Sequence, residues 1–256
     1  MSIIDPVRFY LHDQLGLRVY KRRHSRLDVE SFIGTVFGRR HDVRFIQCGA
    51  HNATANDPLR PFWSHCPWKG VLIEANPIVF EELKKSLGGQ TRVQGRHIAL
   101  TENVGEVSFY IVNHPNATKR PIYAGQISSL AQARVIEELQ SWGHSQEEAK
   151  RFVTERRVPG ENFEHLFGRL GWRPDLLFMD LEGYDYKILK TYPFDLHKPE
   201  MIVFEHNHLC PDEMAASERL LIESGYHFFT LKEDVVAWRV KPLGQSYETA
   251  GEKQAS

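Results

Sequence analysis

Cysteines are few in this chain, and those present lie far apart. Cys48, Cys66 and Cys210 are the only three among 256 residues, and no two of them form a C-x-x-C pair. This spacing excludes both a disulfide-stapled extracellular scaffold and a zinc site built on paired thiols. Scattered thiols are typical of a reducing compartment, so we predict a cytoplasmic protein.

Long apolar runs and an excess of one charge are also missing. No stretch approaches the roughly 18 apolar residues of a membrane-spanning helix, and Met1–Asp5 does not begin a signal peptide. The 32 basic and 33 acidic residues give a net charge of −1. A protein that binds nucleic acid needs a basic surface, so we expect no nucleic-acid partner. The lack of a long apolar run likewise predicts no membrane span.

The third absence is the glycine pattern G-x-G-x-x-G of dinucleotide-binding proteins. The apolar run 43–46 nevertheless predicts a buried parallel strand that ends at Gly49 and Ala50, where small residues let a ligand approach the backbone. A second run, 70–73, ends at Glu74, and an acid at the tip of the second strand can bind both hydroxyls of a ribose. A nucleoside ligand without a pyrophosphate fits this pattern, and S-adenosylmethionine is the common one. A nicotinamide dehydrogenase is disfavoured.

Apolar runs and helical patterns alternate along the rest of the chain. This rhythm predicts an α/β fold, a doubly wound and mostly parallel sheet that closes with an antiparallel hairpin. The expected strands after the first two are 92–100, 106–112, 175–179, 201–204, 226–231 and 235–240. The expected helices are two within 6–40, one capped by Asp28, and further helices at 77–87, 161–170, 184–190 and 211–224. Another helix is expected after Asp57, with Pro58 in its first turn.

Three segments resemble the motifs of the FkbM-type methyltransferases. They are F-I-Q-C-G-A-H-N-A-T-A-N-D-P-L-R-P-F at 45–62, W-K-G-V-L-I-E-A-N-P-I-V-F-E-E-L at 68–83 and D-L-L-F-M-D-L-E-G-Y-D-Y-K-I-L at 175–189. Their order and spacing cover most of residues 43–205. The chain departs from the family pattern at His51 and Asn52, where Asn-Asp is usual, at Ala53, where Gly is usual, and at Phe178, where many members carry Lys.

The resemblance implies a seven-stranded, Rossmann-like sheet of the class I methyltransferases that binds S-adenosylmethionine. The residues that it places around this cofactor are Gln47, Gly49, Ala50, His51, Glu74, Ala99 and Asp180. The adenine ring is expected at the end of the third strand, around 97–101.

Methyl transfer to a hydroxyl requires an aligned acceptor and a group that takes its proton. Candidates follow two predicted strands: Asp180 and Glu182 after one, and Glu205, His206 and His208 at the end of the other. We predict catalytic roles for Asp180, Glu182 and His206. Asp180, Glu205 and a histidine could instead hold a divalent metal ion. The two carboxylates could also simply cap the helix that begins near Tyr184.

Three parts of the chain are predicted: an N-terminal helical extension, 1–42, a methyltransferase domain, 43–241, and a polar tail, 242–256. Within the domain, 113–155 interrupts the α/β rhythm and is expected to form an insertion that covers the acceptor site. The acceptor that the resemblance implies is a hydroxyl of a sugar, glycan or glycosylated natural product. Methylation of another small molecule, or cofactor binding without catalysis, are the alternatives. The oligomeric state is not predicted.

Overall fold

The computed structural model describes residues 28–38, 40–54, 57–113 and 127–239. The first predicted helix of the extension and the tail 242–256 lie outside these residues. Among the described helices, none combines the length and the apolar character needed to cross a membrane.

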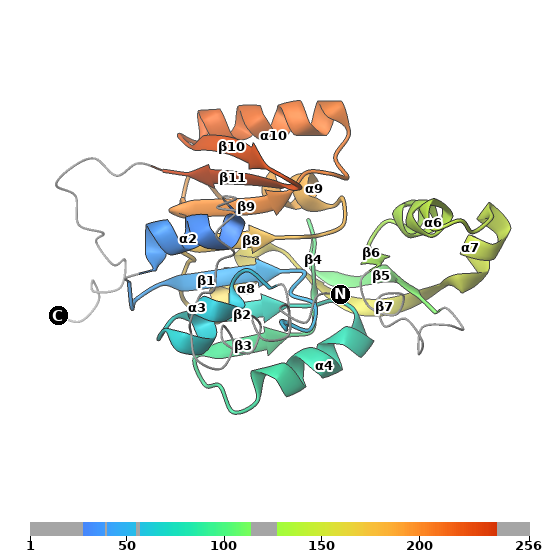
Figure 1. Ribbon diagram of the computed structural model, residues 1–256, viewed down its shortest axis with the longest axis horizontal. Helices are drawn as coiled ribbons and strands as arrows, with labels where there is room; N and C mark the ends of the chain where they lie inside the picture. Colours follow the sequence, from blue (N-terminus) through green and yellow to red (C-terminus); the bar gives the residue numbers. More distant parts are fainter. Residues whose placement is uncertain (1–27, 39, 55–56, 114–126, 240–256) are drawn as a thin grey trace, which may run out of the picture.

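The main sheet has seven strands in the order β10-β11-β9-β8-β1-β2-β3 (Figure 1). Neighbouring strands from β9 to β3 are parallel, and β11 runs antiparallel to both β9 and β10. This confirms the predicted doubly wound sheet with a closing hairpin. In sheet order the strands are β10 (His227–Leu231), β11 (Asp234–Trp238), β9 (Met201–Glu205), β8 (Leu176–Met179), β1 (Arg44–Cys48), β2 (Lys69–Ile73) and β3 (Val93–Arg96).

Helices cover both faces of the main sheet, because its central strands are buried on both sides and read as continuous apolar runs. On one face the strands pack against α2 (Val29–Phe37), α3 (Arg60–His65) and α4 (Pro77–Leu87). On the other face they pack against α8 (Phe163–Leu170), α9 (Asp185–Leu189) and α10 (Pro211–Glu223). Each helix buries its own apolar stripe against the sheet, and all but α2, which precedes β1, connect two strands.

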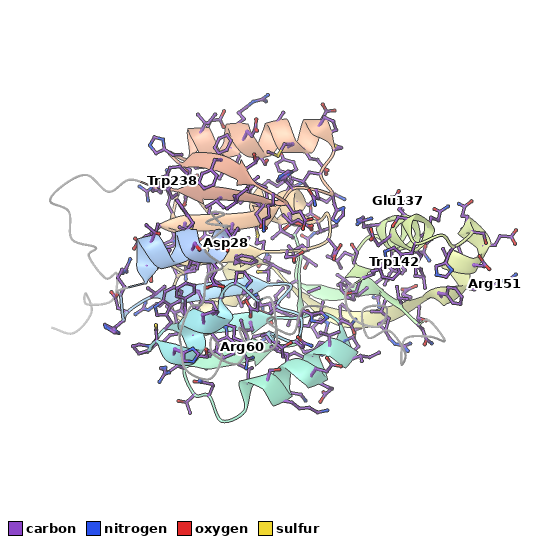
Figure 2. The ribbon with its side chains drawn as sticks, viewed as in Figure 1. Asp28, Arg60, Glu137, Trp142, Arg151 and Trp238 are labelled. Carbon is purple, nitrogen blue, oxygen red and sulfur yellow. The ribbon has the colours of Figure 1, made fainter. Side chains whose placement is uncertain are left out.

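Two helix starts illustrate how local sequence sets the boundaries. The side chain of Asp28 accepts a hydrogen bond from Ser31 N at 2.8 Å, which confirms the predicted cap of α2 (Figure 2). The prediction for the helix after Asp57 was wrong in detail: α3 begins at Arg60, and Pro61, not Pro58, lies in its first turn. Asp57 Oδ1 instead accepts from Leu59 N at 2.9 Å, so residues 57–59 form a turn before the helix.

A second, four-stranded sheet branches from the main one, with the order β4-β7-β5-β6. Its members are β4 (Ala99–Leu100), β5 (Gly105–Val112), β6 (Ser128–Ser129) and β7 (Val153–Glu161), and helices α6 (Gln132–Ser141) and α7 (Gln146–Phe152) pack on β5. The strand expected over 92–100 is thus divided between the two sheets, as β3 and β4. The strand expected over 106–112 forms, but it belongs to the second sheet.

This excursion, Ala99 to Glu161, is longer than the predicted insertion 113–155, because β7 returns antiparallel along the whole of β5. It projects sideways from the carboxyl ends of the main strands, and Arg151 marks its outer part (Figure 2). The chain re-enters the main domain at Asn162, whose side chain caps α8. The excursion is therefore positioned beside any ligand bound at the strand ends.

Candidate active site

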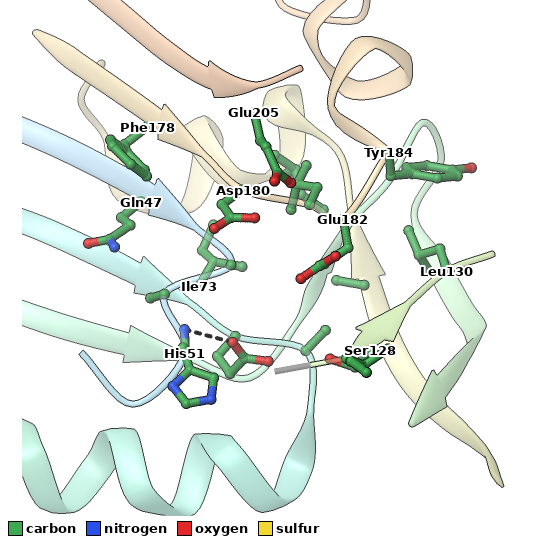
Figure 3. A pocket seen from close by; sticks show the side chains of 18 of the residues that line it. Gln47, His51, Ile73, Ser128, Leu130, Phe178, Asp180, Glu182, Tyr184 and Glu205 are labelled. Carbon is green, nitrogen blue, oxygen red and sulfur yellow. Dashed lines mark hydrogen bonds between the residues drawn. The ribbon is translucent and has the colours of Figure 1, made fainter. Parts of the chain in front are cut away.

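A cavity of about 570 Å³ opens where the carboxyl ends of β1, β2, β8 and β9 face the excursion (Figure 3). Its wall contains every residue predicted to bind the cofactor: Gln47, Gly49, Ala50, His51, Glu74, Ala99 and Asp180. Ligands of open α/β sheets bind at this edge, outside the strand ends. We call the part formed by β1, β2 and β4 the cofactor end, and the part formed by β8, β9 and α6 the acceptor end.

Gly49 is the point where β1 gives way to the cavity. Its φ is +72°, and a Cβ built on it would lie 1.8 Å from the backbone carbonyl oxygen of Asp180. No side chain fits there, because the clash is with backbone that is fixed by the β1–β8 pairing. In the turn that follows, both His51 and Ala53 have positive φ values of 48°. Position 53 therefore adopts the left-handed conformation although alanine stands there in place of the usual glycine.

Glu74 has a fixed orientation at the tip of β2. Its Oε2 accepts from His51 N at 2.9 Å, drawn as a dashed line in Figure 3, and its Oε1 accepts from Asn76 N at 2.7 Å. Burial raises its pKa to about 7, although both backbone donors favour the charged form. Each carboxylate oxygen keeps a second lone pair for a ligand hydroxyl. Glu74 can thus accept from both hydroxyls of a ribose, as the sequence predicts.

Two buried acceptor atoms at the cofactor end lack a donor among the described residues. They are Gln47 Oε1 and Asp57 Oδ2, and the pair is joined by a hydrogen bond of 3.2 Å from Gln47 Nε2 to Asp57 Oδ1. Buried polar atoms without partners are rare in proteins, so these two await a ligand that donates. An ammonium group supplies such donors. Together with Glu74, these atoms fit the amino acid and ribose parts of S-adenosylmethionine.

One part of the cofactor end has an apolar wall. Ile98, Ala99 and Leu100 border the cavity after β3, and Phe109 of β5 lies beyond them. A flat aromatic base is held by such a surface, since burial of its faces removes apolar area from water. The predicted region for an adenine ring, 97–101, therefore lines the cavity at Ala99.

Three carboxyl groups crowd the acceptor end, from Asp180, Glu182 and Glu205 (Figure 3). Glu182 has a positive φ of 51°, which turns it back toward β9. Burial and the nearby Asp180 raise the pKa of Glu182 to about 8, and both causes also raise the pKa of Glu205 well above its ordinary range. Burial raises the pKa of Asp180 as well, and a hydrogen bond from Glu205 opposes that shift. Burial together with the neighbouring carboxyls therefore favours the protonated form at this end of the cavity.

His208 and Arg134 complete this cluster. His208 Nε2 lies 3.5 Å from Glu182 Oε2 and 3.6 Å from Glu205 Oε1, and Arg134 Nη2 lies 2.9 Å from the same nitrogen. Glu182, Glu205 and His208 offer ligand atoms within 4.8 Å of one another, a spacing that a metal ion could bridge. Because Arg134 already brings a positive charge to this point, we assign no metal ion, and the predicted divalent ion stays a prediction.

His206 is the predicted catalytic residue that the structure does not bring to the cavity. Its ring Nε2 lies 3.1 Å from the carbonyl oxygen of Lys232, in the turn between β10 and β11, and it is not part of the cavity wall. Side chains alternate along an extended chain, so His206 and Glu205 point to opposite sides. His208 reaches the cavity instead, because the chain turns after β9.

The sequence predicts that 113–155 covers the acceptor site, but sequence reasoning missed the side chains that α6 contributes to the cavity wall. Arg134 and Glu138 line the acceptor end, as does Trp142 just after the helix. Arg134 and Glu138 form an ion pair of 2.8 Å, four residues apart. That spacing is visible in the sequence but is common on solvated helices. Only the tertiary fold brings this pair to a site, next to Glu182 and His208.

The strand order, the closing antiparallel hairpin and the cavity at the carboxyl ends of the strands are those of a class I methyltransferase domain. The family model for the methyltransferase FkbM domain matches residues 47–228, well over half of the chain. The chain therefore belongs to the FkbM methyltransferase family, and it is an S-adenosylmethionine-dependent methyltransferase. The resemblance drawn from the three sequence motifs is confirmed.

Solved structures show more distant likenesses. An FkbM methyltransferase from Methylobacillus flagellatus KT is 13% identical, with a TM-score of 0.49 over 77% of this chain and 44% of its own. The METTL16 methyltransferase domain is 10% identical, with a TM-score of 0.47 over 93% and 82%. A human methyltransferase 10 domain containing protein is 11% identical, with a TM-score of 0.42 over 92% and 96%. No curated protein matches the chain. We draw no functional conclusion from likenesses this distant.

Proposed function

We propose that this enzyme methylates a hydroxyl group of a sugar, a glycan or a glycosylated small molecule. The observation that carries the proposal is the convergence of Asp180, Glu182, Glu205 and His208 beside the cofactor end of one cavity. A hydroxyl must lose its proton as it is methylated, and this cluster holds several groups able to take that proton. When bound, the cofactor supplies a methyl group already activated by the sulfonium.

The shape and charge of the acceptor end support a polyhydroxyl acceptor. Carboxyl groups and an imidazole can accept hydrogen bonds from several hydroxyls at once, and Trp142 offers an aromatic face. Phosphate-rich acceptors are disfavoured because carboxyl groups outnumber the one guanidinium of the wall. The acceptor is therefore a small molecule or glycan, not a nucleic acid.

The excursion acts as the cover of the acceptor end in this proposal. Ser129 Oγ donates to the carbonyl oxygen of Glu182 at 3.5 Å, and Arg134 lies 3.8 Å from the Glu182 carboxyl. Leu130, Arg134 and Trp142 form wall that the main sheet does not provide. A cover of this kind excludes water from the acceptor without touching the ribose site.

The test is transfer of labelled methyl from S-adenosylmethionine to a panel of methyl glycosides and to fractionated glycans. We expect label on a hydroxyl oxygen, located by NMR of the product. Glu74→Ala serves as the control, because it should raise the cofactor concentration needed without changing the position of the methyl group. Label found only on nitrogen or on a carboxylate would contradict the proposal.

A further inference from the structure

The cavity wall contains two imidazoles, His51 at the cofactor end and His208 at the acceptor end. His208 stands apart because one of its ring nitrogens, Nε2, lies close to three ionisable side chains. Arg134 Nη2 is 2.9 Å away, Glu182 Oε2 3.5 Å and Glu205 Oε1 3.6 Å. The nearest of these, the guanidinium, fixes the chemistry of the nitrogen.

A guanidinium can only donate hydrogen bonds, so the nitrogen that it contacts must be an acceptor. His208 Nε2 therefore carries a lone pair, and any ring proton is on Nδ1. Burial and the charge of Arg134 lower the pKa of His208, while Glu137 and Glu138 of α6 and Glu233 of the β10–β11 turn oppose this. Glu182 and Glu205 face the same nitrogen, but their raised pKa values reduce their negative charge. The guanidinium contact and the lowered pKa of His208 both favour the neutral imidazole.

We propose that His208 is the base that takes the acceptor's proton, and that Arg134 keeps it unprotonated until the acceptor hydroxyl takes the place of the guanidinium. The inference rests on the proposed function. The hydroxyl oxygen forms a bond to the methyl carbon as the carbon–sulfur bond breaks and its electron pair goes to sulfur. The hydroxyl proton passes to His208 Nε2 and later to solvent.

The guanidinium of Arg134 has other partners when the acceptor hydroxyl displaces it from His208. Its Nη2 is already 2.8 Å from Glu138 Oε2 and 3.8 Å from Glu182 Oε2, so a small rotation leaves it paired. Its buried Nε has no partner among the described residues, which leaves a donor for the acceptor itself. Binding of the acceptor would therefore change the environment of the base, His208, through Arg134, a residue of the excursion.

The first experiment compares His208→Ala with the wild type in the methyl-glycoside assay. We expect kcat to fall by about 10²–10⁴-fold, with cofactor affinity unchanged, and added imidazole to restore part of the rate. His227→Ala is the matched control, because His227 is exposed on β10 and outside the cavity wall, so its rate should equal that of wild type. A structural role for His208 would not respond to imidazole.

The second experiment follows the ring signals of His208 by NMR against pH in the protein without acceptor. In Arg134→Ala we expect the pKa of His208 to rise, because a positive neighbour is lost while the carboxyl groups stay. The acid limb of the kcat/KM profile, which reports the free enzyme, should move to higher pH by the same amount. Arg134→Lys keeps the charge and should stay nearer to wild type.

The outcomes separate the two claims. No labelled hydroxyl product from the wild type overturns the proposed function, and this inference with it. Wild-type activity that persists in His208→Ala overturns only the inference, as does a loss confined to His206→Ala. An unshifted His208 titration in Arg134→Ala overturns the role given to Arg134.

Discussion

The two ends of the cavity satisfy their polar groups in different ways. At the cofactor end, the Glu74 carboxyl is held by backbone donors of His51 and Asn76, which lie close to it in the fold. At the acceptor end, the carboxyls of Asp180, Glu182 and Glu205 face one another, with Arg134 as the nearby cation. The first arrangement is a preformed receptor, whereas the second stores electrostatic strain that a substrate can relieve.

Gly49 lies at the junction of the cofactor end and the acceptor end, so a substitution of this residue should disrupt both ends of the cavity. Gly49→Ala places a methyl group against the Asp180 carbonyl and forces a positive φ on alanine. We expect the free energy of unfolding to fall by about 3 kcal/mol or more and cofactor binding to be lost. Denaturant unfolding and calorimetry would measure the two effects.

Gly168→Ala is the control for this prediction. Gly168 lies within α8, and a Cβ there would meet no atom within 4 Å. It should raise stability by about 0.5–1 kcal/mol, since alanine is the better helix former. Normal cofactor binding in Gly49→Ala would show that the strand end is not the shared point of the two ends.

Asp180→Asn should separate activity from stability at the acceptor end. Asp180 raises the pKa values of both Glu182 and Glu205, so its removal relieves repulsion. We expect turnover to fall by about 10²-fold, as an ionisable group beside the reacting atoms is lost. The free energy of unfolding at pH 8 should rise by about 0.5–2 kcal/mol. A loss of both would indicate a structural role for the carboxyl.

Glu74→Ala tests the cofactor end alone. Losing charge-assisted hydrogen bonds to the ribose should weaken S-adenosylmethionine binding by roughly 1.5–3 kcal/mol, measured by calorimetry, while the acceptor KM stays the same. Glu81→Ala on the exposed surface of α4 is the matched control and should bind normally. An unchanged affinity of Glu74→Ala for S-adenosylmethionine would contradict the assignment of Glu74 to the ribose.

The smallest expected effect is the pH dependence of stability. In the folded protein the pKa of Glu182 is about 8 and that of Glu74 about 7, both above the ordinary value of 4.5. The folded state therefore binds more protons than the unfolded chain between pH 4.5 and 8, and this contribution to stability is lost as the pH rises through that window. We expect Tm to be lower at pH 8 than at pH 5.5, by about 2–4 °C for each kcal/mol.

Glu182→Gln should reduce that decline, because the glutamine cannot ionise. Glu164→Gln, at an exposed position of α8, should follow the wild-type curve. A Glu182→Gln curve parallel to the wild type would mean that the acceptor end is not crowded with charge in solution.

The sequence by itself determined the main sheet and the cofactor end. The buried strands are continuous apolar runs, and two key residues of the cavity directly follow them: Gly49 after β1 and Glu74 after β2. Parallel strands end at one edge, so reading the strands correctly also places these residues. Local patterns sufficed because the information lies within a few residues of each strand end.

The tertiary structure alone decided the acceptor end. The alternation along β9 and the turn after it bring His208 rather than His206 into the cavity, a choice that depends on where the strand stops. Arg134 meets His208 across 74 positions of sequence, because β7 pairs with β5 and this sheet holds α6 beside the residues that follow β8 and β9. Contacts between residues so far apart follow from packing and chain topology, which no local pattern encodes.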